Sequence, residues 1–374
     1  MDRTNISIDD FSKMVKEHLF DNKPGMAETH TADINEVMKN NGMLLHGLTM
    51  RGNDEHIAPT IYLEKFFDEF KDGKALSEIV DKILDIYEEH KAPKNICVDF
   101  FTDFNQAKDR LAMKVVNAEK NAEMLANAPH YTFGDLAAIF QVQVDATEYG
   151  NAVITVKDEH MKMWGVKTED LMNLAKENMA QNQPVRIQGM MEVLREMMGD
   201  VPAEMLPTGE DQMYVMSNET KINGAAAVIF TEKLDEFAKD KNADLFIIPS
   251  SIHECIIVPD TGNIKAEDLG AMVKDVNSTQ VAPDEVLSDN VYFYDREAKT
   301  LYITATNEPC VLESDGKDFS TKEKKRADKA SEKAAEKAES GPKSLKDRLA
   351  DGKERSEGLM DAAKDIARED KSCR

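Results

Sequence analysis

Between residues 213 and 304, short apolar segments alternate with tight polar turns. Apolar runs of about four to eight residues bounded by Gly, Pro, Asn or Ser are typical of β-strands. Because these turns are too short for a parallel crossover, the sheet must be antiparallel, and the predicted fold class is α+β. We predict the order ββαββαββ, with strands at Met213–Ser217, Ala225–Phe230, Leu245–Pro249, Ile252–Val258, Val291–Tyr294 and Thr300–Thr304 and helices at Glu232–Lys239 and Lys265–Val276.

Residues 1–183 show a similar mixture of helical and extended patterns, so we expect a second α+β unit with mostly antiparallel strands and flanking helices. Asp109–Val116 fits either a strand or the end of a helix. Predicted helices are Ile8–Phe20, Glu64–Phe70, Leu76–Tyr87, Lys157–Trp164 and Thr168–Met179. Predicted strands are Met43–Met50, Ile57–Leu63, Ile96–Phe101, Phe133–Val144 and Ala152–Val156.

Two further segments differ from these units in composition. Residues 184–212 are rich in Pro, Gly and Met, and we predict a hinge or interface segment in which Val185–Met198 forms one amphipathic helix. Residues 313–374 hold few large apolar side chains, and their like charges recur at four-residue spacing, which weakens an isolated helix. We therefore predict units at 1–183 and 213–312, followed by a disordered or transiently helical tail.

The formal net charge of −24 lies on the body of the chain. Residues 313–374 hold 17 Lys and Arg against 16 Asp and Glu, so residues 1–312 hold 30 against 55, a net charge of −25. Phosphate contacts need clustered cations. The acidic body therefore argues against general nucleic-acid binding, and also against binding to anionic membranes.

The sequence shows no signal-peptide pattern and no apolar run of membrane-spanning length. Its four cysteines show no CxxC spacing. We therefore expect a cytoplasmic protein with reduced thiols. The oligomeric state stays open at this point.

The segment from Pro249 to Cys255 gathers the most reactive side chains, namely Ser250, Ser251, His253 and Cys255. Common signatures such as GxxxxGK[ST], GxGxxG, HExxH and GxSxG are absent. In an extended strand His253 and Cys255 face one way and Glu254 the other. A hydrolase-like relay through His253 would thus need an acid from elsewhere. A structural hairpin with a hydrogen-bonded His explains the same residues.

His46 and His56 fall on the two strands of a hairpin predicted around Arg51–Asp54. Across this hairpin the two imidazoles could lie close together, with Asp54 and Glu55 nearby, which gives the donor types of a metal site. Ordinary surface chemistry is the commoner explanation of such a pair. The sequence carries no cofactor signature, and we expect no cofactor.

A set of short motifs spread along the chain carries a family resemblance. The motifs are Ala58–Leu63, Asn117–Asp135, Met213–Asn218, Gly224–Ala226, Pro249–Glu254, Val276–Thr279, Val286–Asp289 and Tyr292–Arg296. Over roughly residues 8–305 the chain resembles a family of uncharacterised proteins from gut-associated anaerobic Firmicutes, classed as a domain of unknown function. This resemblance implies no activity, cofactor or catalytic residue. Ser344–Leu349 is similar to C-termini of conjugative-element accessory proteins, which implies a link to a mobile genetic element.

The absence of catalytic signatures favours a non-enzymatic binding or accessory protein with a protein partner. Methionine side chains adapt to differently shaped surfaces, so the Met-rich segment 184–212 is one predicted contact surface and the tail is the other. A hydrolase-like enzyme that uses His253 with Ser250, Ser251 or Cys255 is the alternative.

Overall fold

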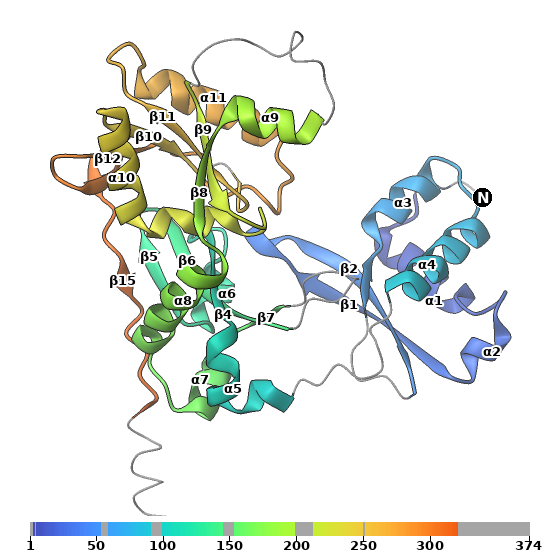
Figure 1. Ribbon diagram of the computed structural model, residues 1–374. Coiled ribbons are helices and arrows are strands. Elements are labelled where there is room, and N and C mark those ends of the chain that lie inside the picture. The colour runs from blue at the N-terminus through green and yellow to red at the C-terminus, as the bar shows by residue number, and fades with distance from the viewer. Residues whose placement is uncertain are drawn as a thin grey trace, which may run out of the picture. The chain divides into compact units, whose positions relative to one another are not determined.

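The computed structural model describes residue 3 and residues 5–53, 59–90, 99–144, 153–198, 212–249 and 251–320 (Figure 1). The chain divides into two compact units, Met1–Asp318 and Phe319–Arg374, and every element discussed below lies in the first. Its three antiparallel sheets with flanking helices confirm the predicted α+β class. None of the described helices is both long and apolar enough to span a membrane.

The first sheet has three strands in the order β1-β2-β3. Its elements are β1 (His30–Met38), β2 (Leu44–Gly52) and β3 (Thr60–Tyr62), with α1 (Ile8–His18), α2 (Pro24–Ala27), α3 (Glu64–Lys71) and α4 (Leu76–His90). Ser7 caps α1 by accepting a hydrogen bond from the backbone N–H of Asp10. The apolar core beneath this sheet draws all its buried residues from Phe11 to Tyr87, so it is built without the rest of the chain.

The second sheet has five strands, in the order β15-β5-β6-β4 with β7 beside β6. Its central strand β6 is buried over almost its whole length, as a strand covered on both faces should be. The strands are β4 (Leu111–Asn117), β5 (His130–Phe133), β6 (Leu136–Gln143), β7 (Val153–Thr155) and β15 (Glu313–Ser314). The helices are α5 (Phe104–Ala107), α6 (Ala122–Ala126), α7 (Asp158–Trp164) and α8 (Thr168–Asn182).

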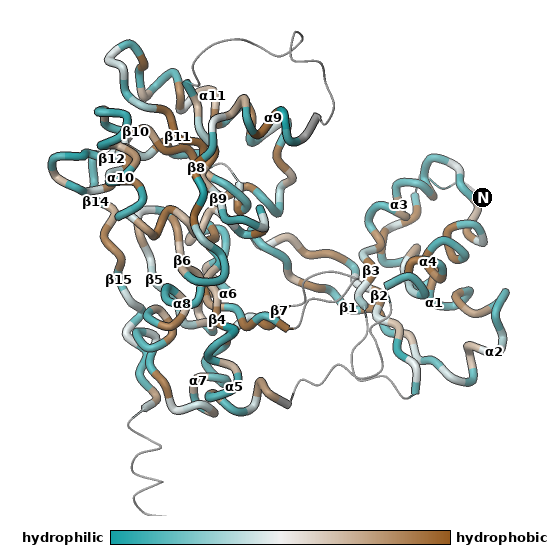
Figure 2. Tube along the Cα trace, in the orientation of Figure 1, coloured by the Kyte–Doolittle hydropathy of each residue, from teal (hydrophilic) through white to brown (hydrophobic). Residues whose placement is uncertain are grey.

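The third sheet has seven strands in the order β14-β13-β12-β10-β11-β9-β8. Its apolar residues gather on the central strands β10 and β11, which are brown in Figure 2. The strands are β8 (Val185–Gly189), β9 (Tyr214–Asn218), β10 (Leu245–Ile248), β11 (Cys255–Pro259), β12 (Tyr292–Asp295), β13 (Thr300–Ile303) and β14 (Glu308–Pro309). The helices are α9 (Met190–Met198), α10 (Thr231–Lys241) and α11 (Ala266–Thr279).

Two predicted elements in this sheet were wrong. Ala225–Phe230 is no strand, because Gly224–Ile229 forms a buried 3₁₀ helix, η5, whose small residues lie close to β9. A Cβ at Gly224 would collide with Ser217 Oγ and His253 O. Val185–Met198 is no single helix, because Val185–Gly189 pairs with β9 as an edge strand and only Met190–Met198 is helical. The order from β8 to β13 is therefore βαβαββαββ rather than ββαββαββ, because α9 lies between β8 and β9.

Three other strand predictions also changed. Strand β1 was missed, since polar residues such as Asp33, Asn35 and Glu36 separate its few apolar side chains. The predicted strand Phe133–Val144 divides at Gly134, whose φ of 59° makes a turn between β5 and β6. The strand predicted at Ile252–Val258 begins only at Cys255. Asp109–Val116 resolves as β4 after a short 3₁₀ turn. Most of the strand predicted at Ile96–Phe101 lies outside the described residues.

The first residues of the predicted tail belong to the folded unit. Glu313–Ser314 pairs with β5 as strand β15. The carboxylate of Asp315, only 6% exposed, accepts a 2.7 Å hydrogen bond from the Thr168 hydroxyl. Lys317 Nζ lies 2.8 Å from Asp158 Oδ1. Because polar contacts hold this segment, its low apolar content wrongly suggested that it belongs to the tail. Residues 321–374 lie outside the described part.

A cluster of polar side chains joins the five-stranded sheet to the seven-stranded sheet. Asp135, in the β5–β6 turn, accepts hydrogen bonds from Ser288 Oγ at 2.7 Å, from Asn290 Nδ2 at 3.0 Å and from the Tyr292 hydroxyl. Ser288 and Tyr292 are almost fully buried. We call these four residues the Asp135 cluster. Beside it, Asn117 of β4 donates to Leu287 O at 3.1 Å.

We predict that Asp135→Ala destabilises the protein by about 2–4 kcal/mol, because the buried hydroxyls of Ser288 and Tyr292 lose their acceptor. Urea unfolding measures this change. Asp68→Ala, on the exposed side of α3, is the control and should change the free energy of unfolding by less than about 0.5 kcal/mol. Equal effects of the two substitutions would show that the Asp135 cluster contributes nothing to stability.

Candidate functional sites

His253 lies in the turn before β11, and two of its neighbours come from other elements. Its Nδ1 accepts a 3.3 Å hydrogen bond from the backbone N–H of Asn223. Its Nε2 lies 3.4 Å from Glu285 Oε1, so an acid from elsewhere in the chain does reach the imidazole. With Nδ1 accepting, the ring proton sits on Nε2 and points at Glu285.

The candidate nucleophiles around His253 have other contacts. Ser251 Oγ accepts a 3.1 Å hydrogen bond from the backbone N–H of His253, which is an ordinary turn contact. Cys255 is fully buried on β11, with Sγ 3.8 Å from Ala225 O. Ser250 lies outside the described residues. Among those described, no serine or cysteine side chain hydrogen-bonds to the imidazole of His253.

Burial raises the pKa of the Cys255 thiol far above its ordinary range, and the nearby charge of Glu254 adds to the shift. Burial also raises the pKa of Cys310, to about 12. Both groups are therefore thiols, not thiolates, at neutral pH. A thiol in this state is a poor nucleophile.

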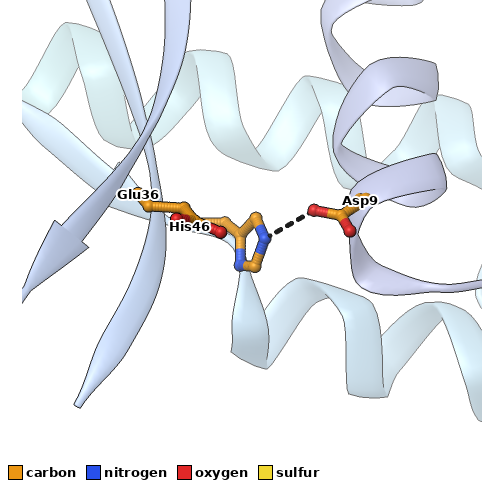
Figure 3. Close-up of side chains that lie close together, drawn as sticks. All are labelled: Asp9, Glu36 and His46. Carbon is orange, nitrogen blue, oxygen red and sulfur yellow. Dashed lines mark hydrogen bonds and ion pairs between the residues drawn. The ribbon is translucent and has the colours of Figure 1, made fainter.

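His46 lies on β2 among carboxylates from three other elements. Figure 3 shows two of these carboxylates, Asp9 and Glu36. Its Nε2 lies 3.0 Å from Asp9 Oδ1 on α1, and its Nδ1 lies 3.1 Å from Glu64 Oε1 at the start of α3. Glu36, its direct cross-strand partner on β1, adds a third carboxylate. We call Asp9, Glu36, His46 and Glu64 the His46 cluster.

Two opposing effects act on the imidazole of His46. Burial disfavours its charged form, while the hydrogen bonds and negative charges of Asp9 and Glu64 favour that form. The second effect is stronger, so the pKa of His46 is raised above its usual value. His46 therefore belongs to an electrostatically coupled group rather than to an ordinary surface position.

The pairing that placed His46 opposite His56 is not tested, because His56 lies outside the described residues. Within the described part, the neighbour of β2 at His46 is β1, the strand that the sequence argument missed. The turn signal Asn40–Gly42 before β2 could have revealed β1, because a hairpin turn implies a strand on each side. Glu36 then follows directly from the register.

A groove of about 690 Å³ lies between the end of the β1–β2 hairpin and the helices α6 and α7. Met38, Met124 and Ala128 contribute its apolar lining, and Met38 is 43% exposed. Charged residues of both signs surround them, namely Lys39, Lys157, Lys162, Glu123, Asp158 and Glu159. We call this feature the Met groove.

The Met-rich segment predicted as a contact surface is partly described. Met190 and Met191 are half-buried on α9, which packs on β8 and β9. Glu196 fixes the helix further through Lys221 Nζ at 2.8 Å and Gln188 Nε2 at 3.0 Å. Leu194 of this helix is 38% exposed. Residues 199–211 lie outside the described part.

We predict that iodoacetamide at pH 8 leaves Cys255 unmodified in the native protein and labels it in urea, because burial holds it as a thiol away from solvent. Peptide mass spectrometry measures both states. Complete labelling of Cys255 without urea would contradict the buried thiol and would reopen its assignment as a nucleophile.

Comparison with curated proteins and with solved structures gave no significant match. A family of unknown function, DUF5688, matches residues 8–296 of the 374. The match runs from the start of α1 to one residue past the end of β12, so it leaves out β13, β14 and β15. It includes the His46 cluster, the Met groove and His253. The chain therefore belongs to the DUF5688 family, whose function is unknown.

Proposed function

We propose that the chain is a non-enzymatic binding protein whose partner is another protein, and that the Met groove is the docking site. The observation that carries this proposal is the combination of exposed methionine and mixed charge in one groove. Methionine side chains adapt to different apolar partners. An apolar centre with a charged rim is the usual anatomy of a protein-binding surface.

The size and charge of the groove support a segment of protein as its occupant. Its volume of about 690 Å³ lies within the range of sites that hold a ligand or a short peptide segment. Three lysines lie on the rim of the groove, although residues 1–312 carry a net charge of −25. Three carboxylates lie beside these lysines and would repel the phosphates of a nucleic acid. An apolar side chain flanked by charges of both signs fits this lining best.

The geometry at His253 supports a binding role over the hydrolase-like alternative. A general base needs a free ring nitrogen that can take a proton from a nucleophile. At His253 one nitrogen accepts from a backbone N–H and the other faces Glu285. Glu285 could serve as the acid of a hydrolase-like relay. Among the described residues, however, no nucleophile contacts the His253 imidazole to complete that relay.

We also propose a more specific role, that of an accessory protein of a mobile genetic element. It rests on the similarity of Ser344–Leu349 to C-termini of conjugative-element proteins. Deleting the gene should lower the frequency of conjugative transfer in a donor strain that carries such an element, and restoring it should return the frequency. Unchanged transfer frequencies in the deletion strain would remove this role.

We predict that a photo-crosslinking amino acid at Met38 captures a protein partner in lysate of the source cells, and that Met124→Asp reduces this capture at least tenfold. The carboxylate would replace an apolar side chain in the lining of the groove. The same crosslinker at Met272, 41% exposed on α11, is the control. Equal capture from both positions, or no effect of Met124→Asp on a folded protein, would contradict docking at the groove.

The tail is the second proposed contact surface, and the fold sets where it should be cut. Because β15 and Lys317 are part of the folded unit, truncation belongs after Ser320 and not at residue 313. We expect the chain that ends at Ser320 to unfold at the same temperature as the full chain but to lose part of its partner set in a pull-down. Identical partner sets would show that the tail takes no part in binding.

A further inference from the structure

We propose that Asp9, Glu36 and His46 bind a divalent transition-metal ion, and that Glu64 positions the imidazole for it (Figure 3). The site is independent of the Met groove and of the proposed protein partner. It uses one nitrogen and two oxygen donors from α1, β1 and β2. The ion would have one histidine and two carboxylate ligands, and its remaining coordination positions would take water or a further ligand.

The donor atoms already lie close together. One carboxylate oxygen each of Asp9 and Glu36 and a ring nitrogen of His46 lie within 4.8 Å of one another. Ligands at about 2.0–2.2 Å from a common metal ion are about 3–4 Å apart, so a small contraction suffices. The Asp9 side chain is 67% exposed and Glu36 is exposed on its strand. Rotation of these two side chains can supply the contraction without a shift of the backbone.

Glu64 fixes the orientation of the imidazole. Its Oε1 lies 3.1 Å from His46 Nδ1 and also accepts a 2.6 Å hydrogen bond from the backbone N–H of His46. A carboxylate that holds one ring N–H leaves the other nitrogen as a ligand, the usual arrangement around metal-bound histidine. That other nitrogen, Nε2, is the one that faces Asp9.

A second observation concerns the other oxygen of Glu64. Oε2 is buried and has no hydrogen-bond partner among the described residues. A buried acceptor without a donor is costly unless a cation or a bound water lies near it. The unpaired negative charge of Glu64, whose side chain is 32% exposed, lies at Nδ1 and makes the ring a stronger donor to a cation at Nε2.

The charge of the cluster also fits a divalent cation. Asp9, Glu36 and Glu64 carry three negative charges, and among the described residues no Lys or Arg forms an ion pair with any of them. One imidazolium would leave two of the three charges uncompensated. A divalent ion brings two positive charges to the point where the carboxylates converge, which reduces their mutual repulsion.

The donor types select among divalent ions. Imidazole suits zinc, copper, iron and nickel, whereas magnesium and calcium prefer all-oxygen sites. We therefore use Zn²⁺ as the probe and Mg²⁺ as the comparison ion. The competing explanation is an imidazolium held by carboxylates with no metal at all, and it predicts no metal binding at these residues.

Isothermal titration of the full chain, first stripped with a chelator, tests the proposal with Zn²⁺. We expect one Zn²⁺ bound per chain at this site, at least tenfold weaker binding in Glu36→Gln, and no comparable binding of Mg²⁺. Glu36→Gln suits the test because no described contact of the fold depends on that exposed carboxylate. Asp33→Asn, which removes an exposed carboxylate from the same strand outside the cluster, is the matched control and should bind Zn²⁺ like the unaltered chain.

A second variant tests the positioning role of Glu64. Glu64→Gln should weaken Zn²⁺ binding about 10–100-fold, the usual effect of losing a carboxylate behind a metal-bound histidine. Circular dichroism must show that each variant remains folded. Absence of Zn²⁺ binding by the unaltered chain, or equal affinities of Glu36→Gln and Asp33→Asn, would overturn the proposal and leave an ion-paired His46.

Discussion

The carboxylate of Asp135 holds the two larger sheets of the protein together. It lies in the turn between β5 and β6, and its three hydrogen-bond donors all come from the segment that leads from α11 into β12. Burial and the nearby carboxylate raise the pKa of Tyr292 well above its ordinary value, so its hydroxyl remains a donor at any physiological pH. Asp135 itself is half-buried, but the hydroxyls of Ser288 and Tyr292 that donate to it are buried and need it as their acceptor.

The same segment also anchors the first sheet. Asn40 donates to Asp284 O at 2.8 Å, and Asn41 donates to Val286 O at 2.7 Å. Asn121 of the five-stranded sheet region completes the contact by accepting from the Asn41 backbone N–H at 3.0 Å. These contacts fix the end of the β1–β2 hairpin, and the hairpin carries Met38 into the groove and Glu36 opposite His46. The Met groove thus depends on asparagine side chains that bind backbone carbonyls, whereas the pairing of Glu36 with His46 is set within the first sheet.

The sequence predicted the parts of the fold that repeat a clear apolar pattern. The α+β class, the antiparallel pairing and most helices followed from spacing and turns. Strand β1 did not, because Asp33, Asn35 and Glu36 make it resemble a loop. The helix η5 was mistaken for a strand, because a run of alanines and aliphatic residues is apolar in either conformation.

The candidate sites, like the fold, could be predicted only in part from the sequence. His46 was a candidate from sequence, but Asp9 and Glu64 come from helices that no local motif connects to it. The acid at His253 is Glu285, 32 positions away in the chain, and only the fold brings the two together. The groove needs Met38 and Met124 in one place, which depends on the Asn41–Asn121 contact. Pairing of distant elements, rather than local spacing, decides these sites.

Unfolding in urea followed by two probes tests the central claim that the Asp135 cluster makes the two larger sheets one cooperative unit. Trp164, the single tryptophan, lies on α7 beside the five-stranded sheet, and the backbone amides of β10 and β11 report on the seven-stranded sheet. If the claim holds, tryptophan fluorescence and hydrogen exchange of those amides give one shared midpoint. Two separate midpoints would show that the sheets unfold independently, and the claim would be wrong.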